Sequence, residues 1–100
     1  MLNSRQRAQL RAMANSYETI LQIGKGGLTD NVVAQAASAL EARELIKGRV
    51  LEASLLTARN AADTLAERIG AETVQTIGSR FILYRESETL PREKRIRLVK

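Results

Sequence analysis

A glycine loop with one lysine, Gly24-Lys25-Gly26-Gly27, is the stretch of this 100-residue chain best suited to bind an anion. It lies between an apolar run that ends at Ile23 and a helix-like run that begins at Asp30. Glycine adopts positive φ values easily and has no Cβ, so its amide groups can approach a bulky anion closely. The following helix start adds unpaired N–H groups, and Lys25 adds a mobile charge. The pattern therefore predicts a phosphate-binding loop, although a turn whose glycines serve geometry alone has the same pattern.

Other phosphate-binding and catalytic motifs do not fit the sequence. Lys25 is followed by Gly26 instead of Ser or Thr, so the loop is not a Walker loop, and the G-x-G-x-x-G pattern of dinucleotide binding is missing. The chain has no histidine and no cysteine, which removes the usual general base, the thiolate nucleophile and nearly every zinc site. We therefore expect no enzymatic activity, no metal and no cofactor.

The charge balance favours a polyanionic partner. The chain has 16 Lys and Arg residues against 11 Asp and Glu residues, a formal net charge of +5, and basic domains of this size commonly bind nucleic acid. Reading of single-stranded bases usually needs aromatic side chains, and the sequence has only Tyr17, Phe81 and Tyr84. Tyr17 and Phe81 fit core positions, and Tyr84 is the one that could touch a ligand. We expect contacts to phosphates and to helix shape more than to bases.

Hydrophobic periodicity predicts seven elements in the order α-β-α-β-α-β-β. The expected helices are 4–16, 30–43 and 57–69, and the expected strands are 18–23, 45–51, 73–77 and 80–85. We expect Ser4 to cap the first helix, Thr29 or Asp30 to cap the second, and Gly78-Ser79 to form a type II′ hairpin turn. Two right-handed crossovers place the second and third helices on one face, which gives a two-layer α/β fold with a four-stranded mixed sheet.

Basic side chains gather at three further places in these elements. Arg7 and Arg11 are four residues apart, so they share one flank of the first helix. Lys47 and Arg49 share one face of the second strand, which is therefore not fully buried. The stretch Leu90–Lys100 holds five cations and one anion, and we expect it to be mobile or lightly docked. In the alternative, its apolar residues form an edge strand or dock on the helices.

Four blocks of the sequence, Ser4–Ala14, Ile23–Thr29, Glu41–Lys47 and Ile77–Arg85, carry a family resemblance. They resemble the CRM family, the chloroplast RNA splicing and ribosome maturation domain, and in particular its bacterial single-domain YhbY-type members. The resemblance covers about residues 3–86. It implies a fold like that of the C-terminal domain of bacterial translation initiation factor three, and binding to structured RNA through a G-x-x-G loop. It also implies a role in maturation of the large (50S) ribosomal subunit.

The resemblance implies RNA-binding roles for the residues at the matching positions of this sequence. Arg49 is added to them because it lies on the basic face of the second strand. The predicted RNA-binding residues are Arg7, Arg11, Gly24, Lys25, Gly26, Gly27, Arg43, Lys47 and Arg49. We expect residues 1–86 to form a CRM-like RNA-binding domain and residues 87–100 to form a basic tail.

The expected partner is ribosomal RNA of large-subunit precursors, bound by a cytoplasmic monomer with no membrane and no small-molecule substrate. The competing hypothesis is a protein-binding adaptor whose basic surface and tail dock on an acidic partner protein.

Overall fold

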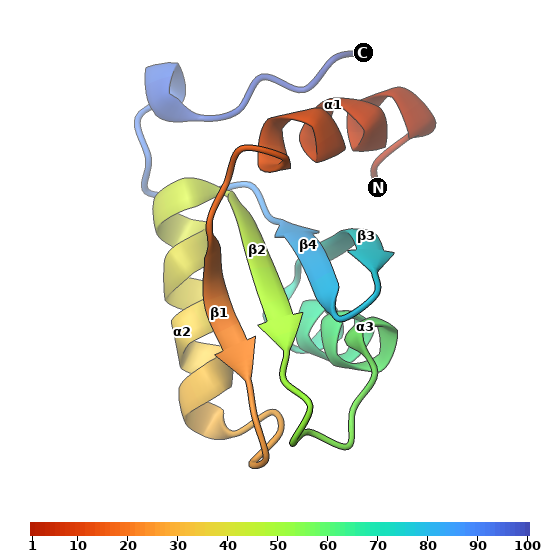
Figure 1. Ribbon diagram of the computed structural model, residues 1–100. Helices are drawn as coiled ribbons and strands as arrows, with labels where there is room; N and C mark the ends of the chain where they lie inside the picture. The colour runs from red at the N-terminus through yellow and green to blue at the C-terminus, as the bar shows by residue number, and fades with distance from the viewer.

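The computed structural model describes residues 1–100 and contains one four-stranded sheet and three α-helices (Figure 1). The elements are α1 (Ser4–Ala14), β1 (Thr19–Ile23), α2 (Asp30–Arg43), β2 (Leu45–Val50), α3 (Ala58–Ile69), β3 (Glu72–Ile77), β4 (Arg80–Tyr84) and the short 3-10 helix η1 (Arg92–Lys94). The predicted α-β-α-β-α-β-β order is confirmed. No helix has both the length and the apolar character needed to cross a membrane.

The strand order in the sheet is β1-β2-β4-β3. β1 and β2 are parallel, and β4 is antiparallel to both of its neighbours, β2 and β3. The second strand of the hairpin therefore lies in the middle of the sheet, between β2 and β3. As predicted, α2 and α3 cover one face, whereas α1 lies against the other face near one end of the strands (Figure 1).

Two hydrophobic clusters hold these layers together. The first lies between the sheet and the pair α2 and α3, and its largest fully buried side chain is Phe81. The second lies between the opposite face and α1; its buried members are Leu2, Leu10, Ala14, Leu45, Val74, Ile82 and Tyr84. Because α1 covers only one end of this face, the other end of the strands is open to solvent, and Lys47 and Arg49 lie there.

The helix starts follow local capping rules. Asn3, not Ser4 as predicted, is the N-cap of α1: its side chain accepts a hydrogen bond from the Gln6 amide, and the Gln6 side chain accepts one from the Asn3 amide. This reciprocal pair is a capping box. Thr29 caps α2 and Thr57 caps α3, each through its hydroxyl. The predicted choice between Thr29 and Asp30 is thus decided for Thr29.

Gly48 in β2 is the position where the sheet has no room for a side chain. It pairs with Phe81 of β4, and a Cβ added to it would lie 2.3 Å from the Cζ atom of that ring. The fully buried ring therefore occupies the space that a side chain at position 48 would need.

Two glutamates near the end of α2 bind the segment that follows β4. Glu44 is completely buried and has a φ of 64°, and its carboxylate accepts hydrogen bonds from the amides of Ser87 and Ile96, both at 2.6 Å. Glu41 accepts from the hydroxyls of Thr89 and Ser87 and from the amides of Thr89 and Glu88. These hydrogen bonds, the Thr89 hydroxyl first, lower the pKa of Glu41 to about 2.

The C-terminal segment, residues 87–100, is docked on the domain. A mobile or only lightly docked tail was expected, and the structure instead has the alternative in which its apolar residues dock on a helix. Its backbone runs along α1, where the Gln9 side chain donates to the carbonyl of Arg97 and accepts from the amide of Val99. Ile96 and Leu98 pack against the second hydrophobic cluster. The segment adds no strand to the sheet, and the division of the chain at residue 86 stays a prediction.

Candidate nucleic-acid interface

The glycine loop is a tight turn at the carboxyl ends of the parallel strands β1 and β2. The amide of Gly27 donates to the carbonyl of Gly24 at 3.0 Å, and Gly27 has a φ of +69°. Gly27 is therefore the residue of the loop whose backbone conformation favours glycine. Because the Gly27 amide is used inside the turn, it does not point freely at an anion. Lys25 is exposed at the tip and forms no ion pair.

The β2–α3 connection lies beside this loop. The amide of Leu51 donates to the carbonyl of Ile23 at 2.8 Å, and the Leu56 side chain lies against Gly27. Leu55 is fully exposed at 101%. The end of the molecule thus presents one lysine and one leucine on neighbouring loops.

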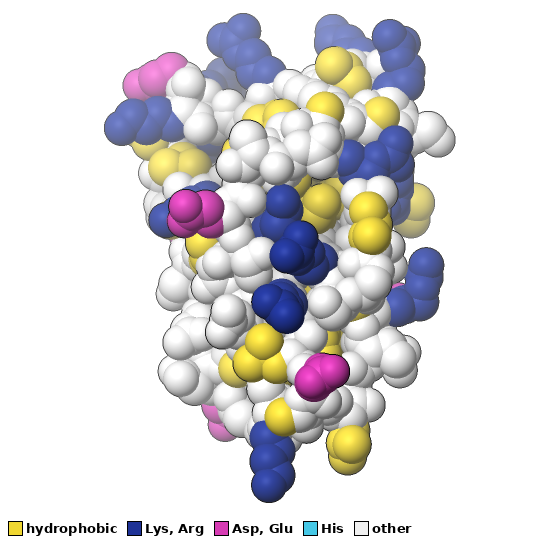
Figure 2. Space-filling model, in the orientation of Figure 1, with side chains coloured by type: hydrophobic (Ala, Val, Ile, Leu, Met, Phe, Trp, Pro, Cys, Tyr) yellow, Lys and Arg dark blue, Asp and Glu magenta, His cyan; other side chains and the backbone are white.

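A group of cations lies on the open end of the sheet. Lys47 and Arg49 point to the face that α2 and α3 do not cover, and Arg80 of β4 is the direct cross-strand partner of Arg49. None of the three forms an ion pair. Figure 2 shows Lys and Arg side chains gathered in a short row near the middle of this face. Like charges directly opposite each other destabilise a sheet, so this arrangement favours an anionic partner.

These three cations line a cavity of about 400 Å³ between the end of α1 and the β3–β4 hairpin. Its lining residues are Asn15, Lys47, Arg49, Gln75, Ile77, Ser79, Arg80, Phe81 and Ile82. No carboxylate lines the cavity, so its polar groups are cations, amides and a hydroxyl.

Arg80 was not among the residues predicted from the sequence. The turn at Gly78-Ser79 predicts that Ile77 pairs with Arg80, but it does not predict which strand lies on the other side of β4. Only the insertion of β4 beside β2 brings Arg80 opposite Arg49.

Arg43 lies beside this group in a second hollow. It lines a cavity of about 370 Å³ together with Lys47, Tyr17, Glu18 and Ile20. Lys47 lines both cavities and so connects them. Tyr17 is half-buried and packs against the second hydrophobic cluster, as predicted for a core position.

Arg7 and Arg11 do not join the cations of the sheet. The Arg7 guanidinium donates to the carbonyl of Thr73 at 2.6 Å and lies 4.0 Å from the Glu72 carboxylate, so it is used within the protein along β3. Arg11 is exposed on α1. Neither of these two predicted RNA-binding residues lines the two cavities that Lys47 connects, and their role in RNA binding stays a prediction.

Tyr84 is not available to a ligand. Only 7% of its surface is exposed, and it belongs to the second hydrophobic cluster. Burial, with help from the charges of Glu44, Glu86 and Glu72, raises the pKa of its hydroxyl to about 12.

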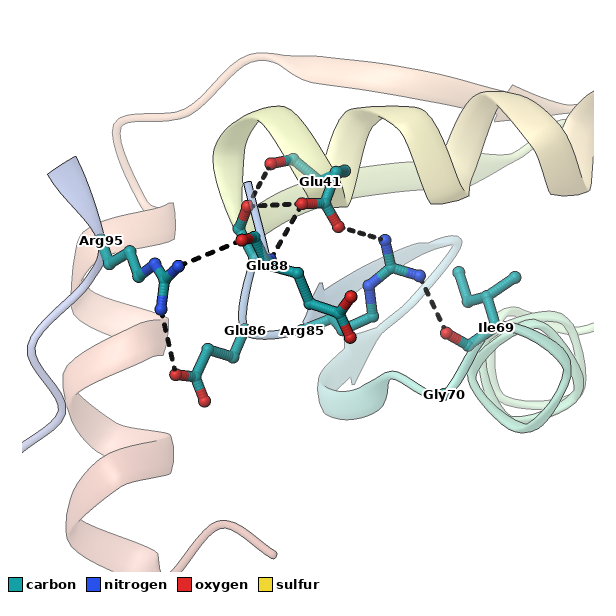
Figure 3. A pocket seen from close by; sticks show the side chains of 8 residues that line it. Glu41, Ile69, Gly70, Arg85, Glu86, Glu88 and Arg95 are labelled. Carbon is teal, nitrogen blue, oxygen red and sulfur yellow. Dashed lines mark hydrogen bonds and ion pairs between the residues drawn. The ribbon is translucent and has the colours of Figure 1, made fainter. Parts of the chain in front are cut away.

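The largest hollow, about 820 Å³, is a structural junction at the end of α2 (Figure 3). Arg85 spans it and donates to the carbonyls of Ile69 and Ala37 and to the Glu41 carboxylate. Arg95 lies across the junction, 3.7 Å from the Glu86 carboxylate. Because these charges are already paired with one another, the hollow is a poorer anion site than the open end of the sheet.

Comparisons with known proteins show which family the chain belongs to. Residues 2–85 match the family model described as the CRS1 / YhbY (CRM) domain. The chain is 43% identical over 88 residues to the Bacillus subtilis protein named Probable RNA-binding protein YqeI. This alignment covers 88% of this chain and 92% of that protein. The chain is 34% identical over 87 residues to a Haemophilus influenzae protein named RNA-binding protein, covering 87% and 88% of the two chains.

The same fold is present in a solved structure. The solution structure of the hypothetical protein SAV1595 from Staphylococcus aureus superposes with a TM-score of 0.79 at 40% sequence identity. The superposition covers 99% of this chain and 100% of that one. Because the family model matches residues 2–85, most of the length of this chain, the chain belongs to the CRS1/YhbY (CRM) domain family.

Proposed function

We propose that this protein is a non-enzymatic RNA-binding protein that binds structured ribosomal RNA in large (50S) subunit precursors and assists ribosome assembly. In this proposal it acts in the cytoplasm as a monomer. The observation that carries the proposal is the group of cations on the open end of the sheet, Lys47, Arg49 and Arg80, which have no acidic partner within the protein. The names of the two sequence relatives, Probable RNA-binding protein YqeI and RNA-binding protein, support RNA as the anion.

The physical argument rests on phosphate contacts. Arg43 and Lys25 extend the group along the same part of the molecule, one beside Lys47 and one at the end of β1, so five cations are available to an RNA backbone. If these five meet phosphates, the logarithm of the binding constant should fall against the logarithm of the salt concentration with a slope of about −3.5 to −4.5. A nearly flat salt dependence would contradict this mode of binding.

Two charge reversals of equal size test which surface binds. Lys47→Glu should weaken RNA binding strongly, because it places a carboxylate between the two cavities of the sheet. Arg59→Glu is the matched control, since Arg59 is exposed on α3, which packs on the opposite face. Equal losses for the two variants would mean that binding follows net charge alone and that this surface is not the site.

The biological partner is identified by crosslinking the protein to RNA in cells and sequencing the bound RNA. Large-subunit ribosomal RNA should dominate, and the Lys47→Glu variant should recover much less of it. Nuclease treatment separates the adaptor hypothesis: an RNA-binding assembly factor leaves the precursor fractions of a gradient when RNA is digested. A protein that keeps its partner after digestion would be an adaptor, and the proposal would fail.

A further inference from the structure

We propose that the cavity on the open end of the sheet holds one unpaired nucleotide of the bound RNA, with its phosphate between Arg49 and Arg80. This inference rests on the proposed RNA binding. It adds a contact to a base, whereas the sequence predicted contacts to phosphates and to helix shape. The ligand class is thus a structured RNA that carries a bulged or looped-out nucleotide, not an uninterrupted duplex.

The register of the sheet arranges the floor of the cavity in two rows across three strands. One row is Arg49 of β2, Arg80 of β4 and Ile77 of β3. The next is Lys47 of β2 with Ile82 of β4 and Gln75 of β3, which pair in the same way. Directly opposed side chains share a face, so all six groups belong to one surface.

The cationic side of this surface fits a phosphate. Arg49 and Arg80 face each other on antiparallel strands without a carboxylate between them, and Lys47 is two residues along on the same face. A guanidinium presents a planar fork of N–H donors that matches phosphate oxygens, so two opposed arginines can hold one phosphate from both sides. A bound phosphate also relieves the repulsion between the two like charges.

The other side of the surface fits a base. Gln75 and Asn15 bring side-chain amides to the cavity, and each amide offers both a donor and an acceptor to the edge of a base. Ile77, which is 64% exposed, and Ile82 provide apolar surface for the face of a ring. The cavity volume of about 400 Å³ lies in the range of small-ligand sites, roughly 300–1,000 Å³.

An unpaired nucleotide is the form of RNA that can use both sides of this cavity. Bases inside a helix are stacked and paired, whereas bases in bulges and loops can be splayed out and bonded on their edges. A duplex alone reaches the cations but leaves the amides without a partner. The absence of an exposed aromatic ring here means that the phosphate carries most of the affinity and that the amides provide discrimination.

The test compares two RNA hairpins that differ by a single bulged nucleotide, titrated into the full-length protein at moderate salt. The bulged hairpin should bind about tenfold more tightly. Gln75→Leu should remove most of this advantage and leave the affinity for the fully paired hairpin unchanged, because it deletes an amide and keeps the charge. Arg80→Gln should weaken binding of the bulged hairpin, with Arg59→Gln as the control of equal charge change.

The outcomes separate this inference from the proposed function. If the unmodified protein binds both hairpins equally in a salt-dependent manner, or if Gln75→Leu keeps the advantage of the bulged hairpin, the inference is overturned and RNA binding stands. If the unmodified protein binds neither hairpin in a salt-dependent manner, the proposed function itself is overturned. Thermal unfolding of each variant, with melting temperatures close to the parent, establishes that the losses come from the site.

Discussion

Glu44 is expected to be the most important single side chain for docking the C-terminal segment. Its buried carboxylate is the acceptor for two backbone amides, those of Ser87 and Ile96, that come from different parts of the segment after β4. It does so from a backbone conformation with φ of 64°, which L-residues rarely adopt. Substitution of this residue therefore tests both the hydrogen bonds and the backbone strain.

The magnitude follows from the two amides. In Glu44→Ala, both lose their acceptor, and a buried donor left unsatisfied costs about 1–3 kcal/mol. The Ser87 amide is fully buried, whereas Ile96 is only half-buried and can be reached by water, so its share is smaller. We expect a loss of about 2–4 kcal/mol in the free energy of unfolding, which lowers the melting temperature of a domain of this size by at least about 8 °C.

A second substitution separates the effect of the hydrogen bonds from that of the backbone conformation. Glu44→Gly loses the same hydrogen bonds but removes the cost of positive φ, which is about 1 kcal/mol or more for a residue with a side chain. Glycine at position 44 should therefore be less damaging than alanine by about that amount. This order is the reverse of that in the interior of a helix, where alanine is favoured over glycine.

Urea unfolding at neutral pH measures these differences, and amide hydrogen exchange of Ile96 reports the docking of the segment directly. Glu52→Ala is the control, because Glu52 is an exposed carboxylate in the β2–α3 connection. A loss below about 1 kcal/mol for Glu44→Ala, with exchange of Ile96 unchanged, would refute the role of the carboxylate. Equal stability of the alanine and glycine variants would refute the argument from positive φ.

Three further predictions concern other parts of the chain. Gly48→Ala should lower the free energy of unfolding, measured with urea, by about 1–3 kcal/mol, because the added Cβ overlaps the Phe81 ring. If adding Phe81→Leu to this variant recovers none of the lost stability, the overlap is not the cause of the loss. Lys25→Glu should weaken RNA binding in a filter assay and leave the melting temperature unchanged, since the lysine is exposed and forms no ion pair. An affinity equal to that of the parent would contradict a role of the glycine loop in RNA binding. The Glu41 carboxyl should titrate near pH 2 when followed by NMR. Because its pKa is lower in the folded state than the ordinary 4.5, the carboxylate stabilises the fold above about pH 4.5, and this stabilisation is lost as the pH falls toward 2. A midpoint near 4.5 would show that its hydrogen bonds to residues 87–89 do not persist.

Much of the fold could be predicted because it depends on neighbours in the chain. Thr57 and Gly70 mark the ends of α3 through a hydroxyl cap and a left-handed residue, and the observed helix matches the predicted range 57–69 to within one residue. Gly78 has a positive φ of 56° and Ser79 does not, as a type II′ turn requires. Such signals are local, so they do not depend on how the elements pack.

Docking of the C-terminal segment was predicted only as an alternative to a mobile tail, because the residues that hold the segment are distant in the sequence. Its charges suggested a solvated tail, but Ile96 and Leu98 alternate with Arg97 and place two apolar side chains on one side of an extended chain. This alternation was available in the sequence as the less favoured alternative. The acceptor at Glu44 lies 52 residues away from Ile96, and no local pattern marks that glutamate as buried.

The sequence by itself determined the order of the elements, the glycine turn and the basic face of β2, because period, capping and turn chemistry act over a few residues. Only the tertiary structure decided which of the basic residues form one surface. Strand pairing inserts β4 beside β2 and brings Arg80 opposite Arg49, while the contact of α1 with β3 turns Arg7 into an internal hydrogen-bond donor. Both outcomes depend on pairing between segments far apart in the chain, which local sequence patterns do not encode.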